Sequence, residues 1–333
     1  MTKRFIESSF CQEDQVFEVP LRPHRLDDFV GQEQIREQLE VLIGAAKKRN
    51  DVLGHLLFSG PPGLGKTTLS HIIAASMGSN ITVTSGPVIE RAGDLAGILT
   101  NLKEGDVLFI DEIHRLNRTV EEYLYPAMED FQLDLVVDSG PSSRSVKVKL
   151  NKFTLVGATT RLGLLSAPLR SRFAFCGRLD YYTPDILEKI LARTARLLNF
   201  DASQGCLEEI SIRCRGTPRI ANNLLKWVRD FATMRAPSQT DVSRDIAKNA
   251  LQLLSIDERG LDEMDLKLLR ILIENYQGGP VGLQTLALAI GEEMHTIEEV
   301  HEPFLIMQGL YERTPRGRKA TPQAFHHLKK ELP

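Results

Sequence analysis

Short apolar runs alternate with stretches of helical periodicity over the first half of the chain. Between the runs, apolar residues recur every three or four positions, as at Leu69, Ile72 and Ile73, which is typical of an amphipathic helix. Strands that alternate with helices predict a parallel sheet flanked by helices. A last short strand is expected near residues 178–182, where it would close the sheet. The runs that we interpret as the main strands lie at residues 56–59, 81–84, 107–110 and 153–158.

The pattern changes to period two between residues 133 and 150. Leu133, Leu135 and Val137 alternate with polar residues, a Gly-Pro turn follows, and residues 146–150 alternate again. This pattern predicts a β-hairpin. Because the hairpin interrupts the strand–helix order, we expect it to project from the core and to offer a docking surface to a partner. The alternative is that it packs on its own domain.

From residue 183 to about residue 255 the periodicity is helical, with one break at residues 215–220 (RGTPRI). Pro218 fits the first turn of a helix. Arg219 would then lie near a helix start, where the helix dipole disfavours a cation unless an anion is close. That anion is either a nucleotide phosphate or a nearby Asp or Glu.

Residues 256–333 have a pattern of their own. Three helical segments precede two short strands that a basic turn joins, at residues 309–321. Three helices and a basic β-wing describe a winged helix, a variant of the helix-turn-helix. The turn carries Arg313, Arg316 and Arg318 but no aromatic or amide side chain that could read bases, so contact with DNA phosphates is expected. The alternative is a solvated run of charges.

Length and composition narrow the class of protein. A chain of 333 residues is too long for one ordinary core, which predicts two or three domains. We expect a mobile tail at residues 1–20 and domains at residues 21–182, 183–255 and 256–333. A composition of 42% hydrophobic and 26% charged residues is typical of a soluble globular protein. No apolar run approaches the roughly 18 residues of a membrane span, and the start of the chain lacks the apolar segment of a secretory signal.

The four cysteines and the charge exclude further classes. The cysteines are scattered without a C-x-x-C pair, which favours reduced thiols in a cytosolic protein over a zinc site. A net charge of −3 argues against a uniformly basic DNA-coating surface. It leaves room for a local basic patch, because nucleic-acid contact depends on how charge is distributed.

The strongest chemical signal follows the first predicted strand. Residues 60–68 (GPPGLGKTT) match the phosphate-binding loop G-x-x-x-x-G-K-[ST], with a strand before it and a helix after it. Gly63 and Gly65 let backbone N–H groups approach phosphates without a Cβ in the way. In such a loop Lys66 reaches the β- and γ-phosphates and the Thr67 hydroxyl binds Mg²⁺. A Gly/Pro turn that happens to carry a lysine does not explain the full pattern, so we expect ATP or ADP with Mg²⁺.

Two further predicted strands end in polar residues. The run at 107–110 is followed by Asp111 and Glu112, which would place one carboxylate at the magnesium ion and the other at the attacking water. An N-cap for the next helix is the alternative. Thr159 and Thr160 follow another strand, and a hydroxyl there could hold the γ-phosphate or the water. Arg172, in the segment after them, is either solvated or supplied to a neighbouring subunit's phosphate.

Longer strings resemble the RuvB family of AAA+ ATPases, which drives branch migration of Holliday junctions in bacteria. The resemblance covers the chain from about residue 21 to its end. It implies an α/β AAA+ ATPase domain with a parallel sheet flanked by helices, then a small helical lid domain and a C-terminal winged-helix domain. The strings are GPPGLGKTT at 60–68, VLFIDEIHRL at 107–116, YPAMED at 125–130, GATTR at 157–161, GTPRIAN at 216–222, GGPVGL at 278–283 and RTPRGR at 313–318.

The resemblance also implies an activity and partners. It indicates a hexameric ATP-dependent DNA translocase that encircles duplex DNA, moves four-way junctions with RuvA, and acts before RuvC in the bacterial cytoplasm. The hairpin at about residues 133–150 resembles the element that docks onto RuvA. Another AAA+ DNA machine, such as a clamp loader, and a nucleotide-gated DNA-binding switch without turnover are the alternatives.

Site residues are carried over position by position. Thr160 would be the first sensor, Arg219 the second and Arg172 the arginine finger, while Asp111 and Glu112 would form the second acidic motif. Leu21 and Arg22 would lie by the adenine; Gly63, Lys66, Thr67 and Thr68 would hold phosphates, with Thr67 and Asp111 on Mg²⁺; Glu129, Asp130, Phe131 and Tyr182 would also contact nucleotide; and Arg313 and Arg318 would contact DNA.

One position departs from the family pattern. Where many relatives carry Gly-Glu-Glu-Arg, this chain has Met294 after Gly291, Glu292 and Glu293. A cation that could contact DNA is therefore absent at that position.

Overall fold

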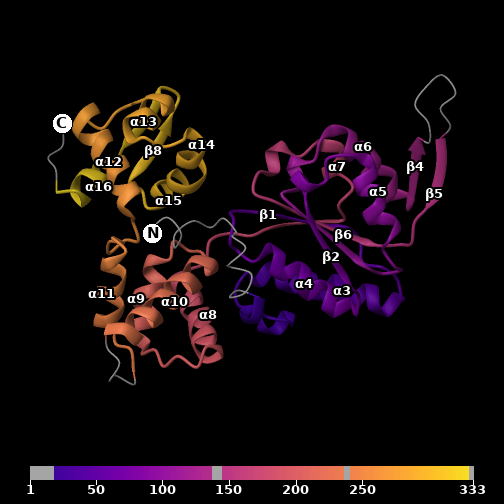
Figure 1. Cartoon of the computed structure of the whole chain (residues 1–333), viewed down its shortest axis with the longest axis horizontal. Helices are drawn as coiled ribbons and strands as arrows, with labels where there is room; N and C mark the ends of the chain where they lie inside the picture. The colour runs from indigo at the N-terminus through magenta and orange to yellow at the C-terminus, as the bar shows by residue number, and fades with distance from the viewer. Residues whose placement is uncertain (1–18, 137–144, 236–240, 330–333) are drawn as a thin grey trace. The chain divides into compact units, whose positions relative to one another are not determined.

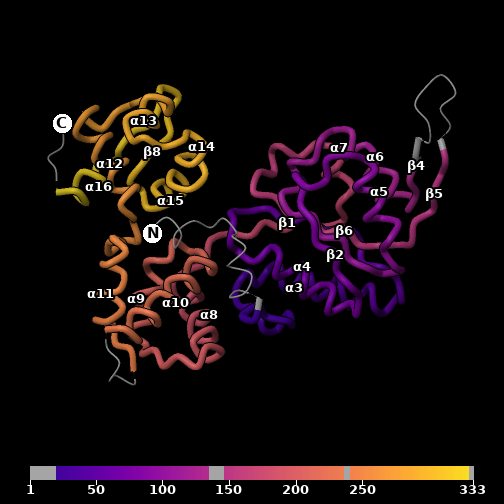
Figure 2. Tube along the Cα trace, viewed as in Figure 1, coloured from indigo at the N-terminus to yellow at the C-terminus, as the bar shows by residue number. Residues whose placement is uncertain are grey.

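The computed structural model describes residues 19–136, 145–235 and 241–329, whose path Figures 1 and 2 trace. These residues form two compact units, one that ends at Tyr182 and one that begins at Thr183. The predicted tail lies outside the described residues, except that Val19–Leu21 forms a short 3-10 helix. Among the described residues, we find no helix that combines the length and apolar character needed to cross a membrane.

The first unit is built on a five-stranded parallel sheet, which confirms the predicted α/β class. The three inner strands are buried runs that are mainly apolar, as expected for a parallel sheet covered on both faces, and the edge strands β2 and β7 are partly exposed. The order is β2-β3-β6-β1-β7, with β1 at Leu56–Ser59, β2 at Ile81–Ser85, β3 at Val107–Asp111, β6 at Thr154–Thr159 and β7 at Phe175–Arg178.

Helices cover both faces of this sheet (Figure 1). One face packs on α5, α6 and α7 through a core that includes Leu57, Leu108, Ile110 and Leu155. Alternate residues of the strands face the other layer, because side chains point to opposite faces in turn. The helices are α3 (Glu33–Arg49) and α4 (Lys66–Met77) on one side and α5 (Ala92–Thr100), α6 (Arg118–Glu129) and α7 (Ala167–Arg170) on the other.

A short strand closes the sheet, as predicted, but it lies earlier than residues 178–182, so its predicted bounds are wrong. The strand is Phe175–Arg178, and the chain then leaves the sheet. Its apolar pattern is weak because Gly177 has no side chain. The rings of Phe58 and Phe175 meet over this glycine, with centroids 6.2 Å apart, and a Cβ there would lie 2.9 Å from Phe175.

The hairpin is confirmed as an antiparallel pair of β4 (Gln132–Val136) and β5 (Ser145–Lys149). Its base belongs to the core, because Leu133 and Leu150 are buried against α6 and β6. The strands then lead away from the sheet (Figure 1), and Val146 is 47% exposed. The base of the hairpin therefore packs on its own domain, and Val146 is exposed beyond it, whereas the docking role of the hairpin stays a prediction. The predicted turn at residues 140–143 lies outside the described residues.

The second unit begins with a helical stretch, as predicted, whose described residues form four helices, although only one break had been expected. Pro218 is the first residue of α10, which confirms its expected position. Apolar faces of all four helices are buried between them. The helices are α8 (Pro184–Leu197), α9 (Gln204–Arg213), α10 (Pro218–Arg235) and α11 (Arg244–Leu253).

A winged helix follows, again as predicted. Its two-stranded wing gains a bridge between Val281 and Arg318. A final helix, α16 (Pro322–His327), was not predicted; Thr321 caps it and Phe325 is buried in the same core. The remaining elements are α12 (Glu263–Tyr276), α13 (Leu283–Ile290), α14 (Met294–Thr296), the π-helical turn Ile297–His301, α15 (Glu302–Met307), β8 (Tyr311–Thr314) and β9 (Gly317–Ala320).

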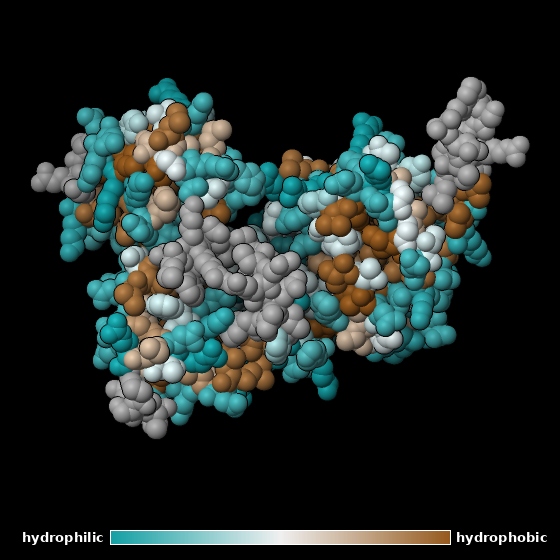
Figure 3. Space-filling model, in the orientation of Figure 1, coloured by the Kyte–Doolittle hydropathy of each residue, from teal (hydrophilic) through white to brown (hydrophobic). Residues whose placement is uncertain are grey.

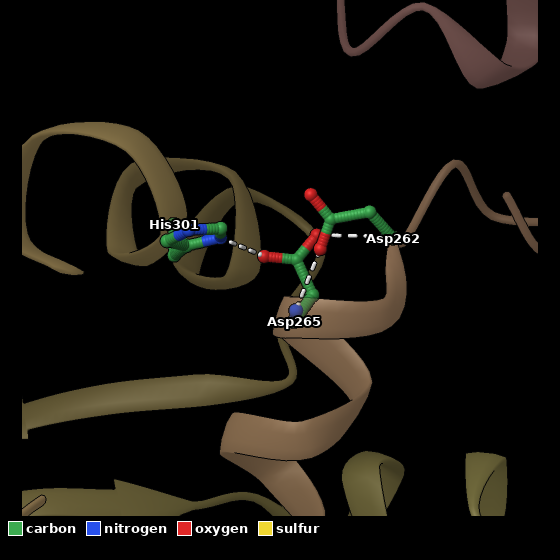
Figure 4. Close-up of side chains that lie close together, drawn as sticks. All are labelled: Asp262, Asp265 and His301. Carbon is green, nitrogen blue, oxygen red and sulfur yellow. Dashed lines mark hydrogen bonds and ion pairs between the residues drawn. The ribbon is translucent and has the colours of Figure 1, made fainter. Parts of the chain in front are cut away.

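A buried ionic cluster joins these helices to the winged helix. Arg215, between α9 and α10, donates from Nη2 to Asp265 Oδ2 at 2.6 Å and lies 3.3 Å from Asp262 Oδ2. Its guanidinium carbon is 4.6 Å from the centre of the Phe304 ring. Asp265 Oδ1 is 2.7 Å from His301 Nδ1, and Figure 4 shows the two carboxylates and the imidazole together. Although these ligand atoms lie within 4.8 Å of one another, the cation among them is Arg215, so the group is an ion-pair cluster.

The two carboxylates of this cluster differ electrostatically. Burial and the charge of Asp265 raise the pKa of Asp262. Burial alone would also raise the pKa of Asp265, but Arg215 and His301 outweigh it and lower that pKa. Asp265 is therefore the ionised partner on which the buried guanidinium depends.

We predict that Asp265→Ala strongly destabilises the second unit. Removing one member of a buried ion pair leaves the other charge uncompensated, at a cost of about 3–5 kcal/mol. For a unit of this size that corresponds to a fall of roughly 10 °C in the midpoint of unfolding. Calorimetry of the full chain should show this fall, while Asp245→Ala, on the exposed side of α11, should leave the midpoint unchanged. Equal midpoints for the two variants would contradict the role of the cluster.

Candidate functional site

Three neighbouring strand ends bring the predicted nucleotide residues to one edge of the sheet. The order β3-β6-β1 places the end of β6 between the other two. The phosphate loop follows β1, Asp111 ends β3, and Thr160 follows β6. The carboxyl edge of a parallel sheet is where such folds bind ligands. The fold therefore assembles residues that are far apart in the sequence.

The phosphate loop has the backbone that close contact with phosphate requires. Gly60, Gly63 and Gly65 have φ values of 138°, 78° and 104°, a region that glycine adopts without strain. A Cβ on Gly60 would lie 2.3 Å from the Leu179 carbonyl oxygen. Helix α4 starts at Lys66, so its N-terminal N–H groups and positive dipole end point into the loop.

Lys66 is buried and closes the loop. Its Nζ donates to the carbonyl oxygens of Gly60 at 2.9 Å and Pro61 at 2.8 Å. An ammonium held at this point can be drawn to a phosphate, which offers it a full negative charge. Thr67 and Thr68 occupy the first turn of α4, beside Lys66.

Tyr182, expected at the nucleotide, and Leu21 and Arg22, expected at the adenine, lie in the same unit as the loop. Tyr182 is buried and its hydroxyl donates to the Leu64 carbonyl at 3.0 Å, and burial raises its pKa. Leu21 is buried as well. Burial lowers the pKa of His71 on α4, and the nearby charge of Arg22 lowers it further. Arg22 therefore lies close to α4. Sequence reasoning did not single out His71.

The second residue of the acidic pair, Glu112, has a strained backbone. Glu112 has φ 46° and ψ 44°, the left-handed region that costs a residue with a side chain about 1–3 kcal/mol. Burial, and then the charge of Asp111, raises the pKa of Glu112; Thr160 and Lys66 oppose them. The Thr160 hydroxyl donates to Glu112 Oε2 at 3.1 Å. The geometry therefore joins the predicted first sensor to the predicted base.

The donor set fits a magnesium nucleotide. Mg²⁺ prefers oxygen ligands and is commonly held by one or two protein groups together with phosphates. Thr67 supplies a hydroxyl and Asp111 a carboxylate, next to a loop of backbone N–H groups. When bound, the ion would neutralise phosphate charge.

A histidine that sequence reasoning did not single out lies beside Glu112. His114, in the 3-10 turn Ile113–Arg115, has a side chain that is 7% exposed. Its Nδ1 lies 2.9 Å from Thr159 Oγ1 and 3.2 Å from Glu112 Oε2. The left-handed turn at Glu112 is what brings the two side chains together, so the sequence carried little sign of this contact.

Arg172 is held at the surface next to the YPAMED segment. Its Nη2 pairs with Glu129 Oε2 at 3.2 Å, its Nη1 donates to the Pro168 carbonyl at 2.7 Å, and its guanidinium lies 4.3 Å from the centre of the Tyr125 ring. Asp130 is exposed like Glu129.

The two remaining nucleotide predictions differ in their surroundings. Phe131 packs edge-on against Phe153, with centroids 5.9 Å apart, so it is part of the core. Arg219 is the second residue of α10 and is half-buried. It stands at a helix start, as predicted, and its role as a sensor stays a prediction.

Two of the three wing arginines, Arg313 and Arg318, are paired inside the winged helix. Glu302 is fully buried and accepts from Arg313 Nε, Arg318 Nε and the Tyr311 hydroxyl. Arg318 also pairs with Glu298 at 2.8 Å, and its side chain is only 18% exposed. The predicted DNA contacts therefore already serve as structural cations.

Comparison with known proteins identifies the family. Residues 21–179 match the family model described as the Holliday junction DNA helicase RuvB P-loop domain. Residues 182–257 match the RuvB AAA lid domain, and residues 258–329 the RuvB C-terminal winged helix domain. The chain belongs to the RuvB family.

Individual relatives agree with this assignment. A protein of Protochlamydia amoebophila named Holliday junction branch migration complex subunit RuvB is 64% identical over 328 residues, 98% of each chain. One of Lawsonia intracellularis with the same name is 56% identical over 92% of this chain and 90% of its own. A solved structure described as the Thermotoga maritima RuvB Holliday junction branch migration motor covers 94% of this chain and 100% of its own, with 51% identity and a TM-score of 0.85.

These findings confirm the RuvB resemblance and the predicted fold class of P-loop α/β domain, AAA lid and winged helix. They also establish the chain as a member of a nucleotide-binding family. The one departure noted in the sequence is accessible, because Met294 lies on α14 and is 47% exposed. A thioether there cannot pair with a phosphate.

We predict that Glu112→Gln retains ATP binding but slows hydrolysis about 10²- to 10⁴-fold, the usual contribution of a general base. An amide keeps the size of the side chain but cannot take a proton from water. Steady-state ATPase rates and the affinity for a fluorescent ATP analogue would measure the two effects. Glu122→Gln, on the exposed face of α6, is the matched control. Normal turnover by Glu112→Gln would show that another group is the base.

Proposed function

We propose that this protein is the ATP-hydrolysing motor that drives branch migration of Holliday junctions in recombination and repair. The observation that carries the proposal is the convergence of Lys66, Asp111, Glu112 and Thr160 at one sheet edge, in a chain that also has a winged helix. The names of its relatives support the same function.

The proposed chemistry uses the site residues as follows. Lys66 and the loop N–H groups hold the phosphates, with Thr68 and Gly63 beside them, and Mg²⁺ is held by Thr67 and Asp111. Glu112 takes the proton of the attacking water, since a buried carboxylate with a raised pKa is a stronger base than an exposed one. Thr160 aligns the water or the γ-phosphate. Leu21, Arg22 and Tyr182 contact the base and sugar side.

The proposed assembly is a homohexameric ring around duplex DNA. Arg172 reaches the phosphates of the neighbouring subunit, with Glu129, Asp130 and Phe131 near that boundary, and Arg219 contacts the nucleotide of its own subunit. Figure 3 shows apolar side chains on the surface of the first unit. Exposed apolar residues of this unit, which include Val88 and Leu164, support contact between subunits.

The proposed partners are RuvA, through the hairpin at about residues 133–150, and RuvC, which resolves the junction afterwards. Arg313 and Arg318 contact the DNA. We place the domains at residues 21–182, 183–255 and 256–333; the matched ranges of the family models support these bounds. The site of action is the bacterial cytoplasm, where the chromosome lies.

Migration of a synthetic four-way junction tests the function. With ATP and RuvA we expect the junction to be converted to two duplexes, and we expect Glu112→Gln to abolish the conversion. ATP turnover without junction movement would favour another AAA+ DNA machine, such as a clamp loader. Stoichiometric ATP binding without DNA-stimulated turnover would favour a nucleotide-gated switch. Either result would reject the proposed motor.

We predict that Arg172 acts across a subunit boundary. Arg172→Ala and Lys66→Ala should each be inactive alone, since an arginine supplied in trans contributes about 10³–10⁵ to turnover. Mixed rings contain some interfaces in which both groups are intact, so mixing should restore part of the ATPase activity. If subunits exchange, as fluorescence energy transfer would show, and activity stays absent, Arg172 does not act in trans.

We predict that Val146→Asp weakens RuvA binding at least tenfold and leaves basal ATPase activity unchanged. Val146 is exposed on the hairpin, so a charge there disrupts an apolar contact without entering the core. Titration calorimetry with RuvA would measure the affinity. Lys147→Asp, on the adjacent exposed position, controls for added charge. Unaltered RuvA affinity of Val146→Asp would place the docking surface elsewhere.

A further inference from the structure

We propose that His114 is a positioning residue that holds the carboxylate of Glu112 in place for hydrolysis. The proposal rests on the proposed function, because it needs Glu112 to act on water. His114 and Glu112 lie in the same unit of the chain, and the proposed hydrolysis gives no role to His114.

The oxygens around the His114 ring determine which of its nitrogens carries the proton. His114 Nδ1 faces two oxygens, Thr159 Oγ1 at 2.9 Å and Glu112 Oε2 at 3.2 Å. If Nδ1 carried no proton, its lone pair would face a carboxylate oxygen, which is repulsive. If Nδ1 carries the proton, it can donate to Thr159 Oγ1 while the same N–H also faces the carboxylate oxygen at 3.2 Å. The carboxylate therefore selects the Nδ1–H tautomer.

The hydroxyl of Thr159, which contacts the His114 ring, is itself held by a hydrogen bond. Thr159 Oγ1 accepts from the Arg161 backbone N–H at 3.0 Å. Thr159 is fully buried as the last residue of β6. The imidazole is thus fixed to a rigid strand on one side and to Glu112 on the other. A reacting group supported in this way needs little reorganisation when water attacks.

The two carboxylate oxygens of Glu112 have different roles in this proposal. Thr160 Oγ1 and His114 Nδ1 both lie within hydrogen-bonding reach of Oε2. The Thr160 backbone N–H also supports the carboxylate, and in this proposal Oε1 is the oxygen that addresses the water. When Thr160 turns to a phosphate, as a sensor would, His114 continues to hold Oε2. This matters because Glu112 sits on a strained backbone, next to the charge of Asp111.

The alternative is a purely structural role, in which His114 only holds its own turn against β6 through Thr159. The two roles predict different effects of a substitution on kcat, nucleotide affinity and stability. A positioning role acts on kcat and spares nucleotide affinity, whereas a structural role lowers stability and affinity together. Asparagine places an N–H donor near the position of Nδ1, so it should rescue a positioning role.

The experiment uses the full chain with His114→Ala, His114→Asn and Thr159→Val, assayed without DNA or RuvA. We expect His114→Ala to lower kcat by roughly tenfold to a hundredfold, the cost of misplacing a reacting group by about 1 Å. KM for ATP, the affinity for ADP and the unfolding midpoint should stay unchanged. His114→Asn should recover most of kcat, and Thr159→Val, which keeps the contact with Glu112, should lose much less than His114→Ala.

A second measurement does not depend on hydrolysis. Correlation of ring ¹H and ¹⁵N resonances of the nucleotide-free protein distinguishes the two tautomers, and the spectrum of His114→Asn assigns the signal. We expect the Nδ1–H form, with a change in tautomer populations in Glu112→Ala.

The two measurements separate failure of the inference from failure of the proposed function. An unchanged kcat in His114→Ala, a loss shared with ADP affinity and stability, or an Nε2–H ring that ignores Glu112→Ala would each overturn the role of His114. A protein that hydrolyses ATP but moves no junction would reject the motor and leave the role of His114 intact.

Discussion

The order of strands in the parallel sheet is the constraint on which the candidate site depends. The carboxyl ends of parallel strands lie at one edge, but only the order β3-β6-β1 brings the acids, the threonines and the phosphate loop side by side. Pairing fixes this arrangement residue by residue, with Ile110 opposite Gly157 and Ser59 opposite Thr159. Because a shift of one residue would turn every side chain to the other face, the buried core of the sheet also fixes the chemistry at its edge.

The site concentrates unfavourable features that the rest of the fold must stabilise. Glu112 combines a left-handed backbone, burial and a neighbouring carboxylate. None of these would persist in an isolated turn. They persist here because β3 and β6 are buried on both faces and because hydroxyl and imidazole groups surround the carboxylate. Strain at such a position is common where a group must be ready to react.

Elements with strong periodicity could be predicted from the sequence, and contacts made by turns could not. The buried runs, the hairpin and the lid helices follow from the spacing of apolar residues. The closing strand was placed too late in the chain because Gly177, which has no side chain, leaves room for the rings of Phe58 and Phe175 and weakens the apolar pattern. His114 escaped prediction because only a left-handed residue brings it back to Glu112. Glu302 looks like an ordinary exposed acid in the sequence, yet it is fully buried beneath the wing.

That buried acid has a consequence for the proposed contact between the wing and DNA. Arg313 and Arg318 face Glu298 and Glu302, so two cations meet two anions before any DNA arrives. A guanidinium has five N–H donors, and those not used by Glu302 can still point at a phosphate. The arginines are thus pre-ordered but nearly neutralised as a group. In the proposed DNA contact these arginines would hold a phosphate only in competition with Glu298 and Glu302, which would suit a motor that must release each phosphate as the duplex advances.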